Sequence, residues 1–80
     1  MFFTYILRSL KDGKRYIGST GNLSIRLEQH NAGNVKSTKN RRPLEIIHFE
    51  KYDTKSEAQQ RERFFKTGKG RVYLKSELDI

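Results

Sequence analysis

Two short runs of β-branched and aromatic residues flank a tight turn at the start of the chain, and this pattern constrains the fold most strongly. Residues 2–10 and 15–19 form the two runs, and Asp12-Gly13 between them is typical of a two-residue hairpin turn. With that turn, the numbers of paired residues sum to 25, so Tyr16 is predicted opposite Ser9. Because side chains alternate along a strand, one face is expected to carry Tyr5, Leu7, Tyr16 and Gly18.

A helix is predicted directly after this hairpin. Thr20 or Asn22 can cap its start, and Gly33 stands where a C-terminal glycine would end it near Ala32. The chain here passes from an apolar run through a glycine-bearing turn into a helix. The junction gathers tyrosine, arginine and histidine side chains within one short stretch, residues 16–30.

The second half of the chain predicts one more strand and two more helices. Residues 44–52 read as a strand, with Leu44, Ile46, His48 and Glu50 expected on one face. Residues 54–57 form a capping box, so a helix is expected from there to about Lys66 or Thr67, ended by Gly68. A short closing helix is predicted from Arg71 to Leu78, packing through Val72, Tyr73, Leu74 and Leu78. Residues 1–80 therefore predict a single α+β domain, a small, mainly antiparallel sheet flanked by helices.

Charge and composition narrow the function. Seventeen Lys and Arg against nine Asp and Glu give a net charge of +8, which favours a polyanionic partner, most often nucleic acid. The ordinary alternative is a solvated basic surface. The absence of cysteine excludes thiolate chemistry and Cys-ligated metal sites. Two histidines make a His-rich metal site improbable, so a metal is expected on oxygen ligands, as for Mg²⁺ or Mn²⁺. No apolar run is long enough to span a membrane and no signal peptide is evident, so a cytoplasmic location is expected.

Five side chains are candidates for a site, and each has an ordinary reading beside it. Glu62 falls on the buried stripe of the second helix, which points to a cation ligand, but an i, i+4 pair with Lys66 explains it as well. Arg26 and His30 lie one turn apart, a spacing that is also common on a solvated helix edge. Tyr5 and Tyr16 can equally be packed strand tyrosines with a wet hydroxyl. The combination of all five is more informative than any member alone.

The motifs resemble those of the GIY-YIG nuclease superfamily. The first motif is Thr4-Tyr5-Ile6 and the second is Tyr16-Ile17-Gly18, followed by Arg26-Leu27 and His30-Asn31, with Arg61-Glu62 farther on. The likeness runs from Phe3 to about Leu74, and the spacing of Arg26 and His30-Asn31 is its more specific part. The chain most resembles compact stand-alone members related to the catalytic domains of UvrC-type DNA repair nucleases.

The resemblance implies a fold and a set of roles. The fold would be a three-stranded antiparallel sheet flanked by helices, and the activity a single-metal, Mg²⁺- or Mn²⁺-dependent endonuclease. Tyr5 would be the general base with Tyr16 orienting water or phosphate, although the two roles can be exchanged. Arg26 would hold the phosphate, His30 would relay or orient a proton, and Glu62 would bind the metal. A tyrosine base needs a lowered pKa, which nearby cations can supply.

A second group of residues is expected to contact the nucleic-acid backbone. Its members are cations of the polar loop and of the C-terminal region: Lys36, Lys39, Arg41, Arg42, Lys66, Lys69 and Arg71. Such contacts give affinity without sequence information, so structure-directed or relaxed cleavage is expected, of DNA rather than RNA. Two other functions stay open, a catalytically weak or inactive nucleic-acid-binding module on the same scaffold and a small domain that binds an acidic protein. The oligomeric state is not predicted.

Overall fold

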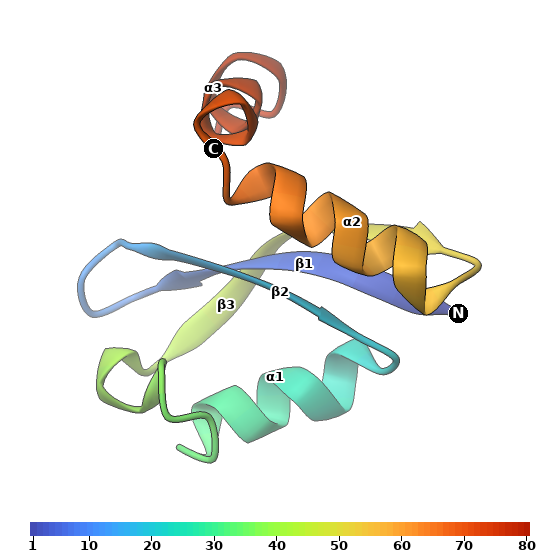
Figure 1. Ribbon diagram of the computed structural model, residues 1–80. Coiled ribbons are helices and arrows are strands. Elements are labelled where there is room, and N and C mark those ends of the chain that lie inside the picture. Colours follow the sequence, from blue (N-terminus) through green and yellow to red (C-terminus); the bar gives the residue numbers. More distant parts are fainter.

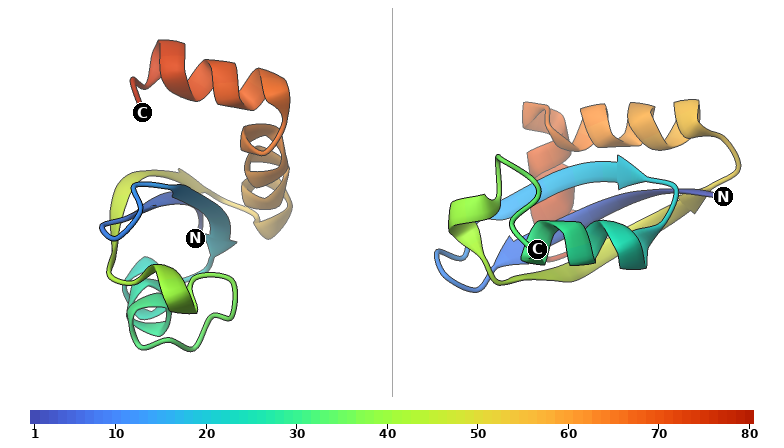
Figure 2. Two further views of the ribbon diagram at one scale, coloured as in Figure 1. Left: turned by 90° about the vertical axis from the view of Figure 1, so that its left-hand side faces the viewer. Right: turned by 90° about the horizontal axis from the view of Figure 1, so that it is seen from below.

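A computed structural model describes all residues, 1–80. A small antiparallel sheet lies between helices on its two faces. The strands β1 (Phe2–Ser9), β2 (Arg15–Thr20) and β3 (Leu44–Tyr52) lie in the order β2-β1-β3. The helix α1 (Leu23–Asn31) covers one face, and α2 (Lys55–Phe65) covers the other (Figure 1). The helix α3 (Gly68–Glu77) turns away from the end of α2 and extends above the β1–β2 hairpin (Figure 2). The predicted α+β fold is confirmed.

The predicted hairpin is present, but its register is wrong by two residues. Tyr16 pairs with Leu7 and Gly18 with Tyr5, and the backbone N–H of Ser9 donates to Lys14 at 2.9 Å, which leaves a four-residue loop. The loop is wider because the Ser9 hydroxyl accepts two backbone N–H bonds across it, both at 3.1 Å. An even shift preserves the alternation of side chains. Tyr5, Leu7, Tyr16 and Gly18 therefore share a face as predicted.

The third strand has the predicted bounds, but its two faces do not. A bulge at Ile47 places Leu7 opposite Ile46 and Ile6 opposite His48. One strand residue is left unpaired, so alternation reverses beyond it. Leu44 and Ile46 pack beneath α1, whereas His48 lies against Phe65 of α2. The prediction that Leu44, Ile46, His48 and Glu50 share one face is therefore wrong.

The helix ends follow the capping residues. Asn22 caps α1 and Thr54 caps α2, each accepting the backbone N–H three residues later. Gly33, at φ 84°, follows the last turn of α1 as predicted. α3 begins at Gly68 rather than Arg71, because the Thr67 hydroxyl accepts the backbone N–H of Gly70 and caps it.

Two small hydrophobic cores lie on the two faces of the sheet. Beneath α1, Tyr5, Leu7 and Leu44 are buried, with Tyr16 packed against them. On the other face, Ile6 is buried against Phe65 and Leu74. Tyr73 and Leu78 join this second core as predicted, but Val72 is 66% exposed and does not. The candidate site therefore lies where the α1-side core meets the edge strand β2.

Candidate active site

Tyr5 occupies the centre of the site because Gly18 leaves room for it. Tyr5 is 2% exposed, and its ring lies over Gly18 on the neighbouring strand. A Cβ atom on Gly18 would stand 2.5 Å from the Tyr5 hydroxyl oxygen and 2.7 Å from Cζ. The glycine of the second motif is thus required by the tyrosine of the first.

Tyr5, Arg26 and His30 are joined in one hydrogen-bonded chain. Arg26 Nε donates to the Tyr5 hydroxyl at 3.3 Å, and that hydroxyl lies 3.0 Å from His30 Nε2. On its other side, His30 Nδ1 lies 2.7 Å from the hydroxyl of Thr38, which donates to the carbonyl of Val35. The consistent assignment has Tyr5 donating to Nε2 and Nδ1–H donating to Thr38. Each member therefore fixes the orientation of the next.

The pKa values of this chain follow from burial. Burial lowers the pKa of His30 to about 4, and the positive charge of Arg26 adds to the effect, so the imidazole is neutral at physiological pH. Burial also raises the pKa of Tyr5, and the hydrogen bond and charge of Arg26 only partly oppose it. The lowered pKa that a Tyr5 base would need is therefore not present in the free protein.

Tyr16 lies beside this chain and is more accessible than Tyr5. It is half-buried, and its ring centroid is 5.0 Å from that of His30 and 6.5 Å from that of Tyr5. The pKa of Arg26 is raised, chiefly by its hydrogen bond to Tyr5, with Tyr16 acting in the same direction. The half-exposed phenol and the half-buried guanidinium thus lie next to each other at the rim of the α1-side core.

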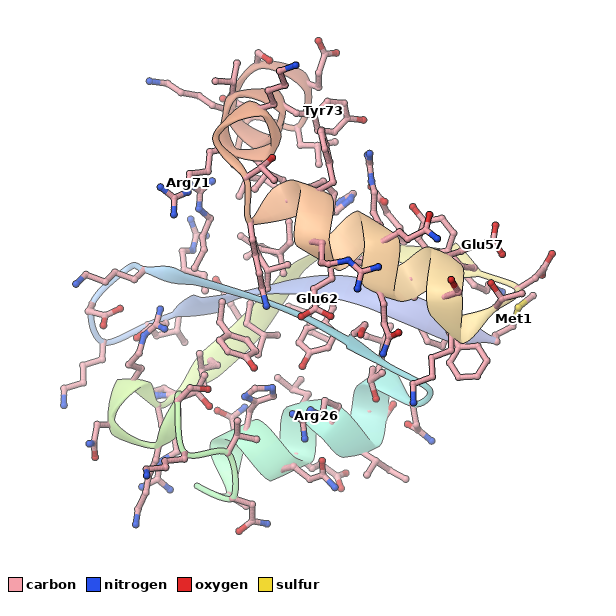
Figure 3. The ribbon with its side chains drawn as sticks, in the orientation of Figure 1. Met1, Arg26, Glu57, Glu62, Arg71 and Tyr73 are labelled. Atoms are coloured by element: carbon pink, nitrogen blue, oxygen red, sulfur yellow. The ribbon has the colours of Figure 1, made fainter.

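Glu62 reaches the site from the opposite face of the sheet. Its Oε1 accepts the hydroxyl of Ser19 at 2.7 Å, and its Oε2 pairs with Lys66 Nζ at 2.7 Å. Figure 3 shows Glu62 on α2 and Arg26 on α1, on the two sides of the sheet at the β2 edge. The charge of Glu62 is among the groups that raise the pKa of Tyr5, so it lies within electrostatic range of the network. The predicted i, i+4 pair with Lys66 is present.

The cations predicted to bind nucleic acid differ in how free they are. Lys36, Lys39 and Lys69 are exposed. Arg41 is held by Asp12 at 3.5 Å and by the backbone carbonyl of Arg15 at 3.1 Å, so it joins the loop to the hairpin. Arg42 donates to the carbonyl of Lys39 at 2.8 Å and lies over Gly33. The loop, which contains the 3₁₀ turn Lys39–Arg41, is thus partly a structural element of the site.

Three polar residues near the site have roles that the sequence did not predict. Thr38 is fully buried beneath His30, although it lies in a stretch that reads only as a polar basic loop. Ser19 holds Glu62, and its place opposite Thr4 on the α2 face follows from strand alternation once the register is known. The amide of Asn31 bonds both the N–H and the C=O of Leu44, at 2.8 and 3.0 Å, and so joins α1 to β3.

Comparison with known proteins shows that the chain is similar to several bacterial UPF0213 proteins. It is 46% identical over 65 residues to the UPF0213 protein lwe0147 of Listeria welshimeri, covering 80% of this chain and 71% of that protein. It is 44% identical over 66 residues to the UPF0213 protein of Staphylococcus aureus strain Mu3, covering 81% and 79%. No helix is long and apolar enough to cross a membrane. The model of the GIY-YIG catalytic domain matches residues 1–75, and the chain therefore belongs to the GIY-YIG family, whose domain implies nuclease activity on nucleic acid.

Proposed function

We propose that the protein is a divalent-metal-dependent endonuclease that hydrolyses phosphodiester bonds, with DNA as its substrate. The observation that carries the proposal is the chain from Arg26 through Tyr5 to His30, which brings β1 and α1 together and leaves the half-exposed Tyr16 beside it. Core packing accounts for the burial of Tyr5 and His30, but it does not require Arg26 and the half-exposed Tyr16 to lie beside them at the rim of that core. Hydrolysis of a phosphodiester does require fixed positive charge beside the phosphoryl oxygens and an oriented base for the attacking water.

The donor set fits a hydrated Mg²⁺ or Mn²⁺ that binds together with substrate. Glu62 and Ser19 offer hard oxygen atoms 2.7 Å apart, and no cluster of three acidic, histidine or cysteine residues is present. Mg²⁺ keeps several waters and is commonly held by one or two carboxylates plus substrate phosphates. A cation on Glu62 would supply Lewis-acid stabilisation of the leaving oxygen. In the free protein, Glu62 forms an ion pair with Lys66, which balances its negative charge.

Arg26 binds the non-bridging oxygens of the scissile phosphate in this proposal. Its Nε is held by Tyr5, and its Nη1 donates to Gln29 at 3.1 Å, so the guanidinium is already oriented before substrate arrives. A pre-oriented guanidinium loses little entropy when it binds a phosphate and meets the negative charge that grows during the reaction. Tyr5 and His30 act as positioning residues, since both are buried and neither faces solvent.

Tyr16 is a stronger candidate for the general base than Tyr5, so the two tyrosines exchange the roles that the resemblance implied. Tyr5 is buried, its hydroxyl has a partner on each side, and its pKa is raised. Tyr16 is the tyrosine that water and substrate can reach. In this assignment Tyr16, ionised to the phenolate, takes the proton of the attacking water and becomes the neutral phenol, while Tyr5 holds Arg26 in place.

The test is cleavage of labelled single-stranded, duplex, flapped and branched DNA, and of RNA, with Mg²⁺, Mn²⁺ or EDTA. Wild-type protein is expected to cut at least one DNA in Mg²⁺ or Mn²⁺ and none in EDTA. Tyr16→Phe and Glu62→Gln are each expected to lower the rate by about 10²-fold or more, since each removes a group that acts on the reacting atoms.

The matched control is Glu77→Gln, which removes an exposed carboxylate from α3 with the same change of charge. It is expected to cut at the wild-type rate. Cleavage that persists in EDTA or in Glu62→Gln would contradict the metal-dependent mechanism. Binding without cleavage of any substrate would favour the inactive nucleic-acid-binding module, which shares the same +8 charge.

A further inference from the structure

A cleft of about 550 Å³ opens between the β1–β2 hairpin and the two C-terminal helices. Its walls come from residues 13–17 on one side and from Phe65, Lys66, Arg71 and Leu74 on the other. Tyr16, the proposed base, is one of the lining residues, although its ring packs on the α1 side of the sheet. Lys66, another lining residue, pairs with Glu62, so the cleft lies next to the candidate active site, across the edge strand β2. The cleft therefore lies where the part of a substrate next to the scissile bond would extend.

The charge of the cleft is entirely positive. Four of its nine lining residues are cations and none is acidic: Lys14, Arg15, Lys66 and Arg71. The ion pairs of the protein involve neither Lys14 nor Arg71, so both remain available to a ligand. Figure 3 shows Arg71 extending from α3 into the space above the hairpin. A cleft with this charge is suited to phosphate groups.

The floor of the cleft is apolar. Ile17, which is half-buried, provides its accessible surface, and the fully buried Phe65 and Leu74 of the α2-side core lie behind it. Basic walls over an apolar floor suit a nucleotide, because the phosphates can meet the cations while a base or sugar covers the apolar surface. The volume is enough for roughly one or two nucleotides and too small for a duplex.

The walls of the cleft are held by contacts within the protein. Arg15 Nη1 donates to the carbonyl of Ile80 at 2.7 Å, which joins the segment after α3 to β2. Gly70 packs so closely on the end of α2 that a Cβ there would overlap the Phe64 carbonyl, so α3 has a fixed point of departure. The cleft thus exists before a ligand binds, which lowers the cost of ordering it.

We infer that this cleft binds one unpaired strand of nucleic acid next to the scissile phosphate, and that the substrate therefore carries a single-stranded arm. The substrate class rests on the proposed function, whereas strand binding by the cleft does not. Of the four cations, Lys14 and Arg15 had no part in the site predicted from the sequence. They contact the strand through phosphates and give no base specificity.

The test compares Lys14→Gln/Arg71→Gln with Lys51→Gln/Lys75→Gln, which removes the same charge from exposed positions outside the cleft. Affinities for a labelled 20-nucleotide strand and for a 20-base-pair duplex are measured by fluorescence anisotropy in EDTA, over a range of salt concentrations. The cleft variant is expected to bind the strand about tenfold more weakly than the control variant. Its log–log salt slope should fall by about 1.4, since each single-strand phosphate contact contributes about 0.7.

The outcomes separate this inference from the proposed function. Equal losses in the cleft and control variants, or equal losses for strand and duplex, would overturn the inference while leaving any metal-dependent cleavage in place. Selective loss of strand binding without cleavage of any substrate would support the cleft as a strand site and contradict the endonuclease. If both hold, wild-type protein should cut arm-bearing duplexes faster than blunt ones, and the cleft variant should lose that preference.

Discussion

Gly18 determines how close Tyr5 can come to the edge strand. Replacing it with alanine would put a methyl group into the Tyr5 ring, 2.5 Å from the hydroxyl oxygen. The ring cannot retreat easily, because it is buried and its hydroxyl is bonded to both Arg26 and His30. The absence of a side chain at Gly18 thus affects the positions of Tyr5, Arg26 and His30, which lie on other elements.

Gly18→Ala is therefore expected to lower the free energy of unfolding by about 1–3 kcal/mol, the usual cost of overpacking. Chemical denaturation measures the loss, and cleavage should fall with it because Arg26 loses its anchor. Gly21→Ala is the control, since its nearest neighbour is a Phe2 ring atom at 3.9 Å. Equal stability of the two variants would contradict the close packing of Tyr5 on Gly18.

At the scale of elements, β3, α2 and α3 are joined through Arg61. Its guanidinium donates to Glu50 at 2.8 and 3.4 Å and lies 4.6 to 5.0 Å from the ring centres of Phe65, Tyr73 and Phe64. Burial opposes the ionisation of Glu50, but hydrogen bonds from Arg61, Tyr52 and His48 outweigh it and lower its pKa. The cluster contributes to holding α2 on the sheet and so to placing Glu62.

Arg61→Met is expected to cost about 2–3 kcal/mol, because Glu50 keeps its charge and loses its cationic partner. Thermal or chemical denaturation measures the loss. Arg63→Met is the matched control, as Arg63 is exposed on the same helix. A cost no greater than that of Arg63→Met would show that the Glu50 cluster does not stabilise the fold.

The helices and strands could be predicted from local sequence patterns, but the way the strands pair with one another could not. The sequence offered Thr20 or Asn22 as the cap of the first helix and Thr54 as the cap of the second; the structure has Asn22 and Thr54. The hairpin register depended on the side chain of Ser9, and the faces of β3 depended on the bulge at Ile47. A bulge is set by how two strands pair across the sheet, so no local pattern predicts it.

The candidate site divides in the same way. The five catalytic candidates could be named from motif residues, and strand alternation placed Tyr5 and Gly18 on one face. Their direct pairing depends on the observed register, which differs from the predicted one by two residues. Thr38 and Ser19 could not, because their contacts depend on where the loop and α2 come to lie. The cleft is likewise a product of how α3 leaves α2, and a sequence pattern contains no such angle.

At the scale of the whole molecule, His30 couples stability to pH. Its pKa is about 4 in the folded protein and near 6.5 unfolded, so between these values the unfolded chain binds more protons than the native state. Stability should therefore fall as pH drops from 6.5 to 4, by on the order of 3 kcal/mol from this group. The carboxylate of Glu50, whose pKa is also lowered, adds its loss only nearer its ordinary value, at the acid end.

Urea unfolding at several pH values checks this coupling. His30→Gln is expected to be less stable at neutral pH but to show a flatter profile between pH 6.5 and 5. An unchanged slope in His30→Gln would mean that His30 is not the group responsible.

The burial of Tyr5 and His30 has a consequence for reading related sequences. A descendant of this fold that no longer cut nucleic acid would still need Tyr5, Gly18 and His30, because Tyr5 and His30 are buried beneath α1 and Gly18 leaves room for the Tyr5 ring. Their presence in a sequence therefore reports folding. Tyr16, Arg26 and Glu62 are half-buried and would be released from selection once cleavage ceased. Under the proposed function, these three positions, rather than the whole motif set, are expected to distinguish an active nuclease from an inactive relative.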